Sequence, residues 1–269
     1  MQQTLAQSLS LHAADMLACV GAGGKTTLCW RLWTECQALT WQPVLTTTTH
    51  LWEPVLPNAS ALLLSTHPDA GLIQRLLRNV AGLVLAAGRL TDVSTDPVGN
   101  PVALVRPVKL AGLSAEAIDD LSRQVAHATW LIEADGARGR SLKVPAAHEP
   151  PIPRRATVVC VITSLDAIGC PLDDTLGHRA EQLAKYLGID IGDTITVDHI
   201  ARLLVDPAAG LKNIPHAARA IAVLSQRDDA RPHPRAKTVA GTLLASGKYE
   251  RVVVASLRAA DPVLEVFAV

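Results

Sequence analysis

The residues with the clearest chemical potential form a glycine-rich segment, residues 20–28, in which a lysine and two threonines follow three glycines. An apolar run at 16–20 precedes the glycines, and a helical pattern at 26–39 follows them. Glycines in such a turn let backbone N–H groups face an anion, and the helix N-terminus adds the positive end of its dipole. The segment therefore predicts a nucleotide-phosphate site made of Gly21, Ala22, Gly23, Gly24, Lys25, Thr26 and Thr27.

Within this loop, Lys25 would reach the β- and γ-phosphates of ATP or GTP, and the Thr26 hydroxyl would hold Mg²⁺. The match to the pattern G-x-x-x-x-G-K-[ST] is partial, because Cys19 occupies the position of the first glycine. A glycine-rich turn from strand to helix does not by itself require a nucleotide. A lysine followed by two threonines is poor packing material, however, and this favours phosphate binding.

Two acids lie at the end of a second apolar strand, predicted at residues 129–134. Glu133 and Asp135 are two residues apart, so they share one face if the strand continues. In phosphate-loop enzymes an acid at this place contacts Mg²⁺ or orients the attacking water. We therefore expect one or both acids to complete a magnesium site with Thr26. The alternative is a pair of solvated acids at the end of a strand.

The loop that follows these acids carries several cations. Beside a nucleotide, Arg138 would stabilise the charge of the transferred phosphate, as an arginine finger does. The same loop could hold an anionic second substrate, or it could be an ordinary solvated loop. The candidates for a second ligand in this region are Arg140, Lys143, His148 and Glu149.

A run of threonines ends the strand predicted at residues 43–49. Threonine favours strands, so β propensity alone would explain the run. Because strand C-termini line the ligand crevice of open α/β sheets, a site role is the alternative. The candidates here are Thr48, Thr49 and His50.

Two further segments are weaker candidates. His178 and Arg179 open a helix predicted at residues 178–187, either as substrate contacts or as a helix start with an exposed ion pair. Asp228 follows a late strand at the place of a guanine-selecting Asn-Lys-x-Asp motif, but serine and glutamine replace the asparagine and lysine. Asp228 is therefore a candidate nucleotide contact that does not settle the choice between ATP and GTP.

Apolar runs alternate with helical patterns along the chain, and this alternation predicts an α/β fold. A mostly parallel sheet with helices on both faces, in three layers, accounts for strands that are apolar throughout. We expect one domain, residues 1–269, with a β-hairpin insertion at about 82–107 whose arms are 82–87 and 102–105. The predicted strands are 16–20, 43–49, 61–64, 82–87, 129–134, 157–163, 220–224 and 251–255, and the predicted helices are 26–39, 69–80, 114–127, 178–187 and 198–205.

Composition excludes several classes of protein. Twenty-five basic and 25 acidic residues give no net charge, which argues against a chain-wide nucleic-acid face. The 49% hydrophobic content argues against disorder. The sequence has no run of about 20 apolar residues, which is the length that a membrane-spanning helix requires. Five cysteines without C-x-x-C spacing argue against structural zinc and fit free thiols in a reducing cytosol. No lysine or arginine precedes Lys25, so the basic region of a secretory signal is missing. We therefore expect a cytoplasmic protein.

These motifs together resemble the YqeC family, known as selenium-dependent hydroxylase accessory proteins, over nearly the whole chain. The resemblance implies a phosphate-loop NTPase-like fold and a role in maturing molybdenum hydroxylases that carry a labile selenium. It also implies a molybdenum hydroxylase or a cofactor-maturation protein as partner. The segments that carry the resemblance are 20–27, 46–50, 109–113, 133–143, 147–153 and 178–181.

Three functions remain open at this point. The first is a Mg²⁺-dependent maturation factor that hydrolyses its nucleotide slowly. The second is a small-molecule kinase acting on a cofactor precursor or a selenium metabolite. The third is a protein that binds nucleotide without hydrolysis and uses it to gate a partner.

Overall fold

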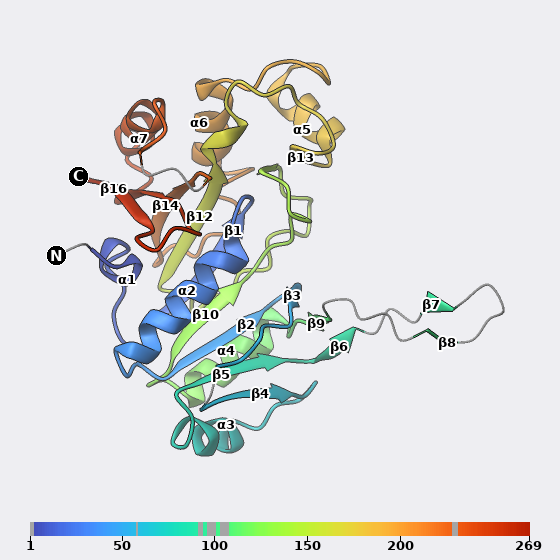
Figure 1. The fold of residues 1–269 in the computed structure, drawn as a ribbon, viewed down its shortest axis with the longest axis vertical. Coiled ribbons are helices and arrows are strands. Elements are labelled where there is room, and N and C mark those ends of the chain that lie inside the picture. Colours follow the sequence, from blue (N-terminus) through green and yellow to red (C-terminus); the bar gives the residue numbers. More distant parts are fainter. Residues whose placement is uncertain (1–2, 58, 91–93, 96–100, 103–107, 228–230) are drawn as a thin grey trace.

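The computed structural model describes residues 3–57, 59–90, 94–95, 101–102, 108–227 and 231–269. Its central element is a nine-stranded sheet in the order β16-β15-β14-β12-β1-β10-β2-β5-β4. All neighbouring pairs in this sheet are parallel except β15 and β16, which are antiparallel. Helices flank the sheet (Figure 1), so the predicted α/β class is confirmed.

The strands of this sheet are β1 (Met16–Gly21), β2 (Pro43–Thr47), β4 (Ser60–Leu64), β5 (Gly82–Ala86), β10 (Thr129–Glu133), β12 (Val158–Ser164), β14 (Arg219–Ser225), β15 (Arg251–Ala255) and β16 (Val263–Ala268). The helices are α1 (Leu5–Ser8), α2 (Lys25–Ala38), α3 (Ala70–Leu77), α4 (Ala115–Gln124), α5 (Ala180–Leu187), α6 (Val197–Val205) and α7 (Ala236–Ala245), with a 3₁₀ turn at Leu165–Ala167. Short strands outside the sheet are β3 (His50–Trp52), β6 (Gly88–Leu90), β7 (Ser94–Thr95), β8 (Pro101–Val102), β9 (Lys109–Ala111), β11 (Leu142–Lys143) and β13 (Gly177–His178).

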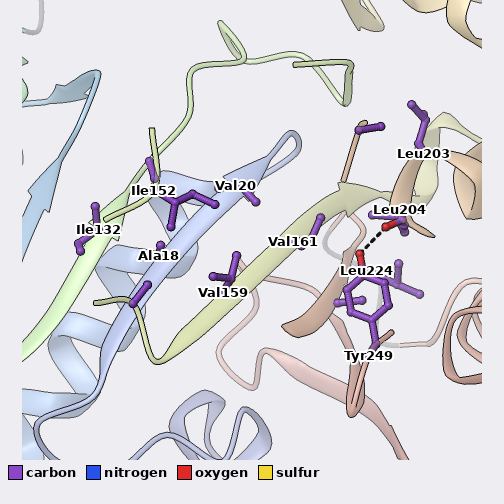
Figure 2. Close-up of a cluster of buried hydrophobic side chains, with 14 of the residues drawn as sticks. Ala18, Val20, Ile132, Ile152, Val159, Val161, Leu203, Leu204, Leu224 and Tyr249 are labelled. Atoms are coloured by element: carbon purple, nitrogen blue, oxygen red, sulfur yellow. Dashed lines mark hydrogen bonds between the residues drawn. The ribbon is translucent and has the colours of Figure 1, made fainter. Parts of the chain in front are cut away.

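Two apolar cores explain the layering. Side chains alternate across a strand, so Leu17 and Cys19 of β1 enter the core formed with α1 and α2. Ala18 and Val20 enter the opposite core, which includes residues of α3, α4, α6 and α7. Figure 2 shows part of this second core, where the Tyr249 hydroxyl donates a hydrogen bond of 2.6 Å to a backbone oxygen of α6. Burial on both faces explains why the central strands lack polar alternation.

The predicted hairpin insertion differs from the structure at its first arm. Gly82–Ala86 is β5, a fully buried strand of the central sheet between β2 and β4. Its apolar residues contact both cores, which a hairpin arm projecting into solvent would not do. After β5, a small antiparallel sheet of β3, β9 and β6 and the separate pair β7–β8 account for the segment. Residues 103–105, part of the predicted second arm, lie outside the described residues.

Two other predicted elements are corrected. The strand expected at 43–49 ends at Thr47, where the Thr47 hydroxyl accepts a 3.0 Å hydrogen bond from the Thr49 N–H and turns the chain into β3. The helix expected from His178 begins at Ala180, because His178 pairs with Lys143 in the short parallel ladder of β13 and β11. The sequence pattern did not predict α1, α7 or β16.

No helix in the described part of the chain has the length and apolar character needed to cross a membrane.

Candidate functional site

The loop between β1 and α2 has a backbone that only glycine adopts readily. Gly21, Gly23 and Gly24 have φ angles of +92°, +90° and +126°. A Cβ on Gly21 would lie 2.3 Å from the Ile162 carbonyl oxygen, and one on Gly23 would lie 2.9 Å from the Ser164 nitrogen. The three glycines therefore allow the loop to pack against the end of β12 while it leads into α2.

Lys25 and Thr26 are the first two residues of α2. The Lys25 side chain folds back along the loop, and its Nζ donates a 2.6 Å hydrogen bond to the Gly21 carbonyl. Lys25 is only 5% exposed, so its ammonium group is held at the loop and does not extend into solvent. The Thr26 hydroxyl donates a 2.7 Å hydrogen bond to Glu133 Oε2. The structure thus brings the predicted lysine, threonine and strand-end acid together.

The two acids after β10 differ in their surroundings. β10 ends at Glu133, and Asp135 lies beyond it, where its Oδ2 accepts a 3.3 Å hydrogen bond from the Gly21 N–H. Asp135 Oδ1 is also paired with the Lys143 ammonium. Because these donors engage Asp135, Glu133 is the acid whose contact with Thr26 suits a metal site.

Burial raises the pKa of Glu133, and the Asp135 charge adds to this, although the Lys25 charge and the Thr26 hydrogen bond act in the opposite direction. A desolvated carboxylate beside a hydroxyl is stabilised by a bound cation. Carboxylate and hydroxyl oxygens are hard ligands of the kind that Mg²⁺ prefers. The donor set of Glu133 and Thr26 therefore fits a magnesium ion.

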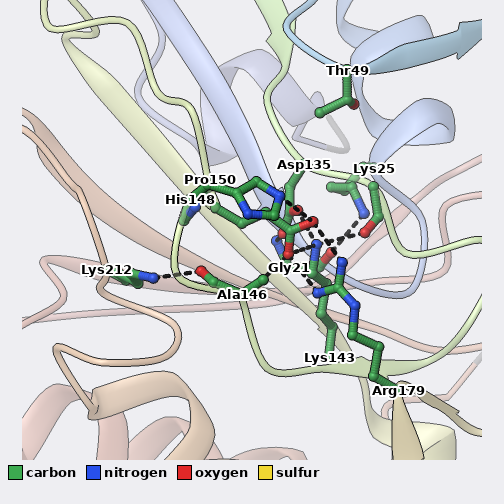
Figure 3. A network of polar contacts seen from close by, with 12 residues as sticks. Gly21, Lys25, Thr49, Asp135, Lys143, Ala146, His148, Pro150, Arg179 and Lys212 are labelled. Carbon is green, nitrogen blue, oxygen red and sulfur yellow. Dashed lines mark hydrogen bonds and ion pairs between the residues drawn. The ribbon is translucent and has the colours of Figure 1, made fainter. Parts of the chain in front are cut away.

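A buried chain of charges lies beside the loop (Figure 3). Lys143 Nζ pairs with Asp135 and Glu149, the latter at 2.9 Å, and donates a 2.6 Å hydrogen bond to the Gly136 carbonyl. Arg179 donates two hydrogen bonds to Glu149, at 2.8 and 3.1 Å. The Lys143 side chain is 1% exposed. Lys143 and Glu149, predicted as second-ligand residues, therefore have protein partners and link the segments that surround the loop.

Burial would raise the pKa of Glu149, but hydrogen bonds from Arg179, the Ala146 N–H and Lys143 outweigh it and hold the pKa well below its usual range. Since the folded-state pKa lies below the unfolded value, Glu149 contributes stability above the unfolded pKa. This contribution is lost as the pH falls through the lowered folded-state pKa. The ionised network therefore stabilises the fold at neutral pH.

An open cleft of about 2360 Å³ runs from the glycine loop to the neighbouring loops. Although the whole chain has no net charge, cations outnumber acids among the described residues that line this cleft. Such a surplus attracts an anionic ligand and raises its local concentration. The charged residues lining the cleft are Lys25, Lys109, Arg138, Arg140, Arg179, Arg227 and Arg258, against Glu133, Glu149 and Asp166.

The remaining predicted residues lie around the rim of this cleft. Arg138 and Arg179 have φ angles of +48° and +61°, a strained conformation for residues other than glycine that is concentrated at functional sites. The Thr48 hydroxyl is buried and has no hydrogen-bond partner among the described residues. Other predicted residues that line the cleft are Thr27, Thr49, His50, Arg140, His148 and His178.

His178 provides a pH-dependent test of this arrangement. Burial, together with the charges of Arg179, Lys143 and Arg138, lowers its pKa to about 4, although the Glu149 charge opposes the shift. The ring is therefore expected to stay neutral at neutral pH and to protonate only as the pH falls towards 4. An NMR titration of the His178 ring protons checks this. A midpoint near 6.5, the value for an unperturbed histidine, would contradict the convergence of cations at this point.

Several residues near the loop were missed by the sequence analysis. Ser225 Oγ at the end of β14 donates a 2.5 Å hydrogen bond to the Gly23 carbonyl. Asp166 accepts a 3.0 Å hydrogen bond from the Arg227 N–H and lines the cleft with Lys109. The signal for Ser225 was its place at the C-terminus of a parallel strand. Asp228 lies outside the described residues, so the structure does not place it.

The fold and this site define an α/β protein in which a glycine-rich loop joins the first strand of a mostly parallel sheet to a helix. The loop lines a cleft that carries a surplus of cations. The family model described as YqeC protein matches residues 17–181, and the chain belongs to this family. A relative from Escherichia coli (strain K12), called uncharacterized protein YqeC, is 28% identical over 212 residues, which cover 77% of this chain and 73% of the relative. No solved structure gives a significant match.

Proposed function

We propose that this protein binds a Mg²⁺–nucleotide at the loop of residues 21–26 and hydrolyses it slowly. The observation that carries the proposal is that a lysine, a glycine turn and a pair of oxygen ligands lie together at the start of α2. Lys25 is buried at the start of α2, the three glycines hold the strained turn before it, and the Thr26 hydroxyl lies 2.7 Å from a Glu133 carboxylate oxygen. An ammonium, a helix N-terminus and a pair of oxygen ligands are the parts that a nucleoside triphosphate requires.

Each part has a distinct role in this proposal. The loop N–H groups and Lys25 bind the phosphates, and Thr26 and Glu133 hold Mg²⁺, which neutralises developing negative charge when bound. Asp135 positions the loop through its hydrogen bond with the Gly21 N–H. Arg138, which is exposed and lines the cleft, would contact the terminal phosphate in this proposal.

Substitution of Glu133 by glutamine tests the metal role. Glu133→Gln keeps the shape of the side chain but removes its charge, so we expect Mg²⁺-dependent phosphate release to fall about 100-fold. Nucleotide affinity measured without Mg²⁺ should change little. Phosphate release from ATP and GTP is measured with and without Mg²⁺.

Glu116→Gln, at an exposed position of α4, is the matched control and should leave the rate unchanged. Equal Mg²⁺-dependent rates in Glu133→Gln and the unsubstituted protein would remove Glu133 from the metal site.

A small-molecule kinase is the second candidate, and the size of the cleft favours it. About 2360 Å³ exceeds the roughly 300–1000 Å³ of a typical small-molecule site, which leaves room for an acceptor. Phosphate release in the absence of acceptor, at a rate that no acceptor changes, would count against a kinase. Tight binding of ATP or GTP with no release would instead favour a nucleotide-gated binding protein.

For the cellular role, we propose a cytoplasmic accessory protein in the maturation of selenium-dependent molybdenum hydroxylases, with such a hydroxylase or a cofactor-maturation protein as partner. Support comes from membership of the YqeC family and from the motifs that resemble it. The test is activation of a purified, immature molybdenum hydroxylase with selenium present. Activation should require this protein and nucleotide together, and equal activation by Lys25→Ala would contradict the proposal.

A further inference from the structure

A small apolar pocket opens next to the phosphate loop. It has a volume of about 280 Å³. Its apolar walls are Trp30, Leu45, Leu51, Trp52, Pro54 and Val55, and Thr26 and Glu53 complete the lining. The Glu53 carboxylate is paired with Arg89 at 2.6 Å, which offsets its charge. Thr26, Leu51 and Trp52 line both this pocket and the large cleft, so the two are continuous. Trp52 is 49% exposed and Val55 is 93% exposed, which leaves the apolar walls open to a ligand.

Strand β3 of the small sheet β3-β9-β6 contributes Leu51 and Trp52 to this pocket, and the sheet continues into the large cleft. Trp52, Lys109 and Leu90 occupy one row across its three strands, and all three line the cleft. Lys109 Nζ lies 4.6 Å from the centre of the Trp52 ring. The row thus combines an aromatic surface, a cation and an aliphatic side chain.

The order of the strands places this pocket on one particular side of the phosphate loop. β14 and β15 lie on one side of β1, whereas β10 and β2, which leads into β3, lie on the other. The ligands proposed for Mg²⁺, Thr26 and Glu133, are shared between β10 and the start of α2. If Thr26 and Glu133 hold Mg²⁺, the ion would neutralise phosphate charge on the β10 side of the loop, which is also the side of β2 and β3.

We propose that the pocket of Trp30 and Trp52 binds a second small ligand, a planar aromatic ring that carries an anionic group. This inference deepens the proposed function, because it places the second ligand beside the terminal phosphate. The ring stacks on Trp52, and the anionic group lies against Lys109. A volume of about 280 Å³ suits a small fused ring, and continuity with a cationic cleft favours a charged small molecule over a peptide.

The probe for this proposal is 2-naphthoate, with the uncharged 2-naphthylmethanol as its partner. Calorimetric titration of the full chain should show one binding site for each. Trp52→Ala should weaken both probes about tenfold, since stacking on an aromatic side chain supplies much of the affinity. Lys109→Met should weaken 2-naphthoate about fivefold and leave 2-naphthylmethanol unchanged. Ile191→Ala, at an exposed apolar residue outside the pocket, is the control.

Unchanged binding of 2-naphthoate to Trp52→Ala would overturn the proposal. Many equivalent weak sites would do the same, because the exposed row would then be an apolar surface of another kind, such as a protein contact. Displacement of 2-naphthoate by adenosine or guanosine would also overturn it, because the pocket would then hold the nucleobase. Lys25→Ala should retain 2-naphthoate binding. Failure of nucleotide binding alone, with Trp52-dependent probe binding intact, would therefore reject the proposed function and leave the aromatic pocket standing.

Discussion

Lys25→Ala is expected to reduce the affinity for ATP or GTP about 100-fold, or to abolish it, while the protein stays folded. The Lys25 ammonium lies at the start of α2 and is 5% exposed, so it is held at the place where the phosphates would bind. A charge-assisted hydrogen bond from a lysine to a phosphate is worth about 1.5–3 kcal/mol, which corresponds to roughly 10- to 150-fold in affinity. Equilibrium binding of fluorescent ATP and GTP analogues measures the effect.

Lys237→Ala, at an exposed position of α7, removes the same charge away from the loop and serves as the matched control. Its affinity should equal that of the unsubstituted protein. Circular dichroism and thermal unfolding of both variants establish that they fold. An affinity of folded Lys25→Ala within about threefold of the starting value would remove this lysine from the phosphate site.

Lys143→Met is expected to lower the free energy of unfolding by about 3–5 kcal/mol at pH 7. The substitution leaves the buried carboxylates of Asp135 and Glu149 without the ammonium that pairs with both. Removal of one partner from a buried ion pair carries a cost of this size, because the remaining charge stays desolvated. For a chain of this length the melting temperature should fall by roughly 10 °C. Urea and thermal unfolding measure both quantities.

Arg123→Met provides the comparison, since Arg123 pairs at 3.2 Å with Asp120 on the surface, where both side chains are more than 60% exposed. That change should cost less than about 1 kcal/mol. Asp135→Asn combined with Lys143→Met should recover part of the loss, because Glu149 keeps Arg179 as partner. A loss below 1 kcal/mol in Lys143→Met would show that the chain of charges does not stabilise the fold.

The sequence predicted those parts of the site that depend on local patterns. The glycines, Lys25 and Thr26 are adjacent along the chain, so their place between an apolar run and a helical pattern was sufficient to predict a turn from strand to helix that contains them. Glu133 and Asp135 were predicted as a pair, without a choice between them, from their place at the end of an apolar strand. Most central strands and helices followed from apolar patterning in the same way.

Features that depend on contacts between residues far apart in the sequence could not be predicted. Nothing local distinguishes Lys143 as the buried partner of Asp135 and Glu149, because that role follows from how two loops fold against each other. The small antiparallel sheet depends on pairing of β3 with β9 across more than 50 residues. His178 was assigned to a helix because its ladder with Lys143 gives no periodic signal over two residues.

The central claim, that the loop at 21–26 binds a Mg²⁺–nucleotide, is tested most directly by calorimetric titration of the unsubstituted protein. ATP and GTP are each titrated with Mg²⁺ and with a chelator. We predict one site per chain for at least one of the two nucleotides, with affinity at least tenfold higher in Mg²⁺, because Thr26 and Glu133 would complete the metal site. No binding of either nucleotide at millimolar concentration, with or without Mg²⁺, would contradict the account.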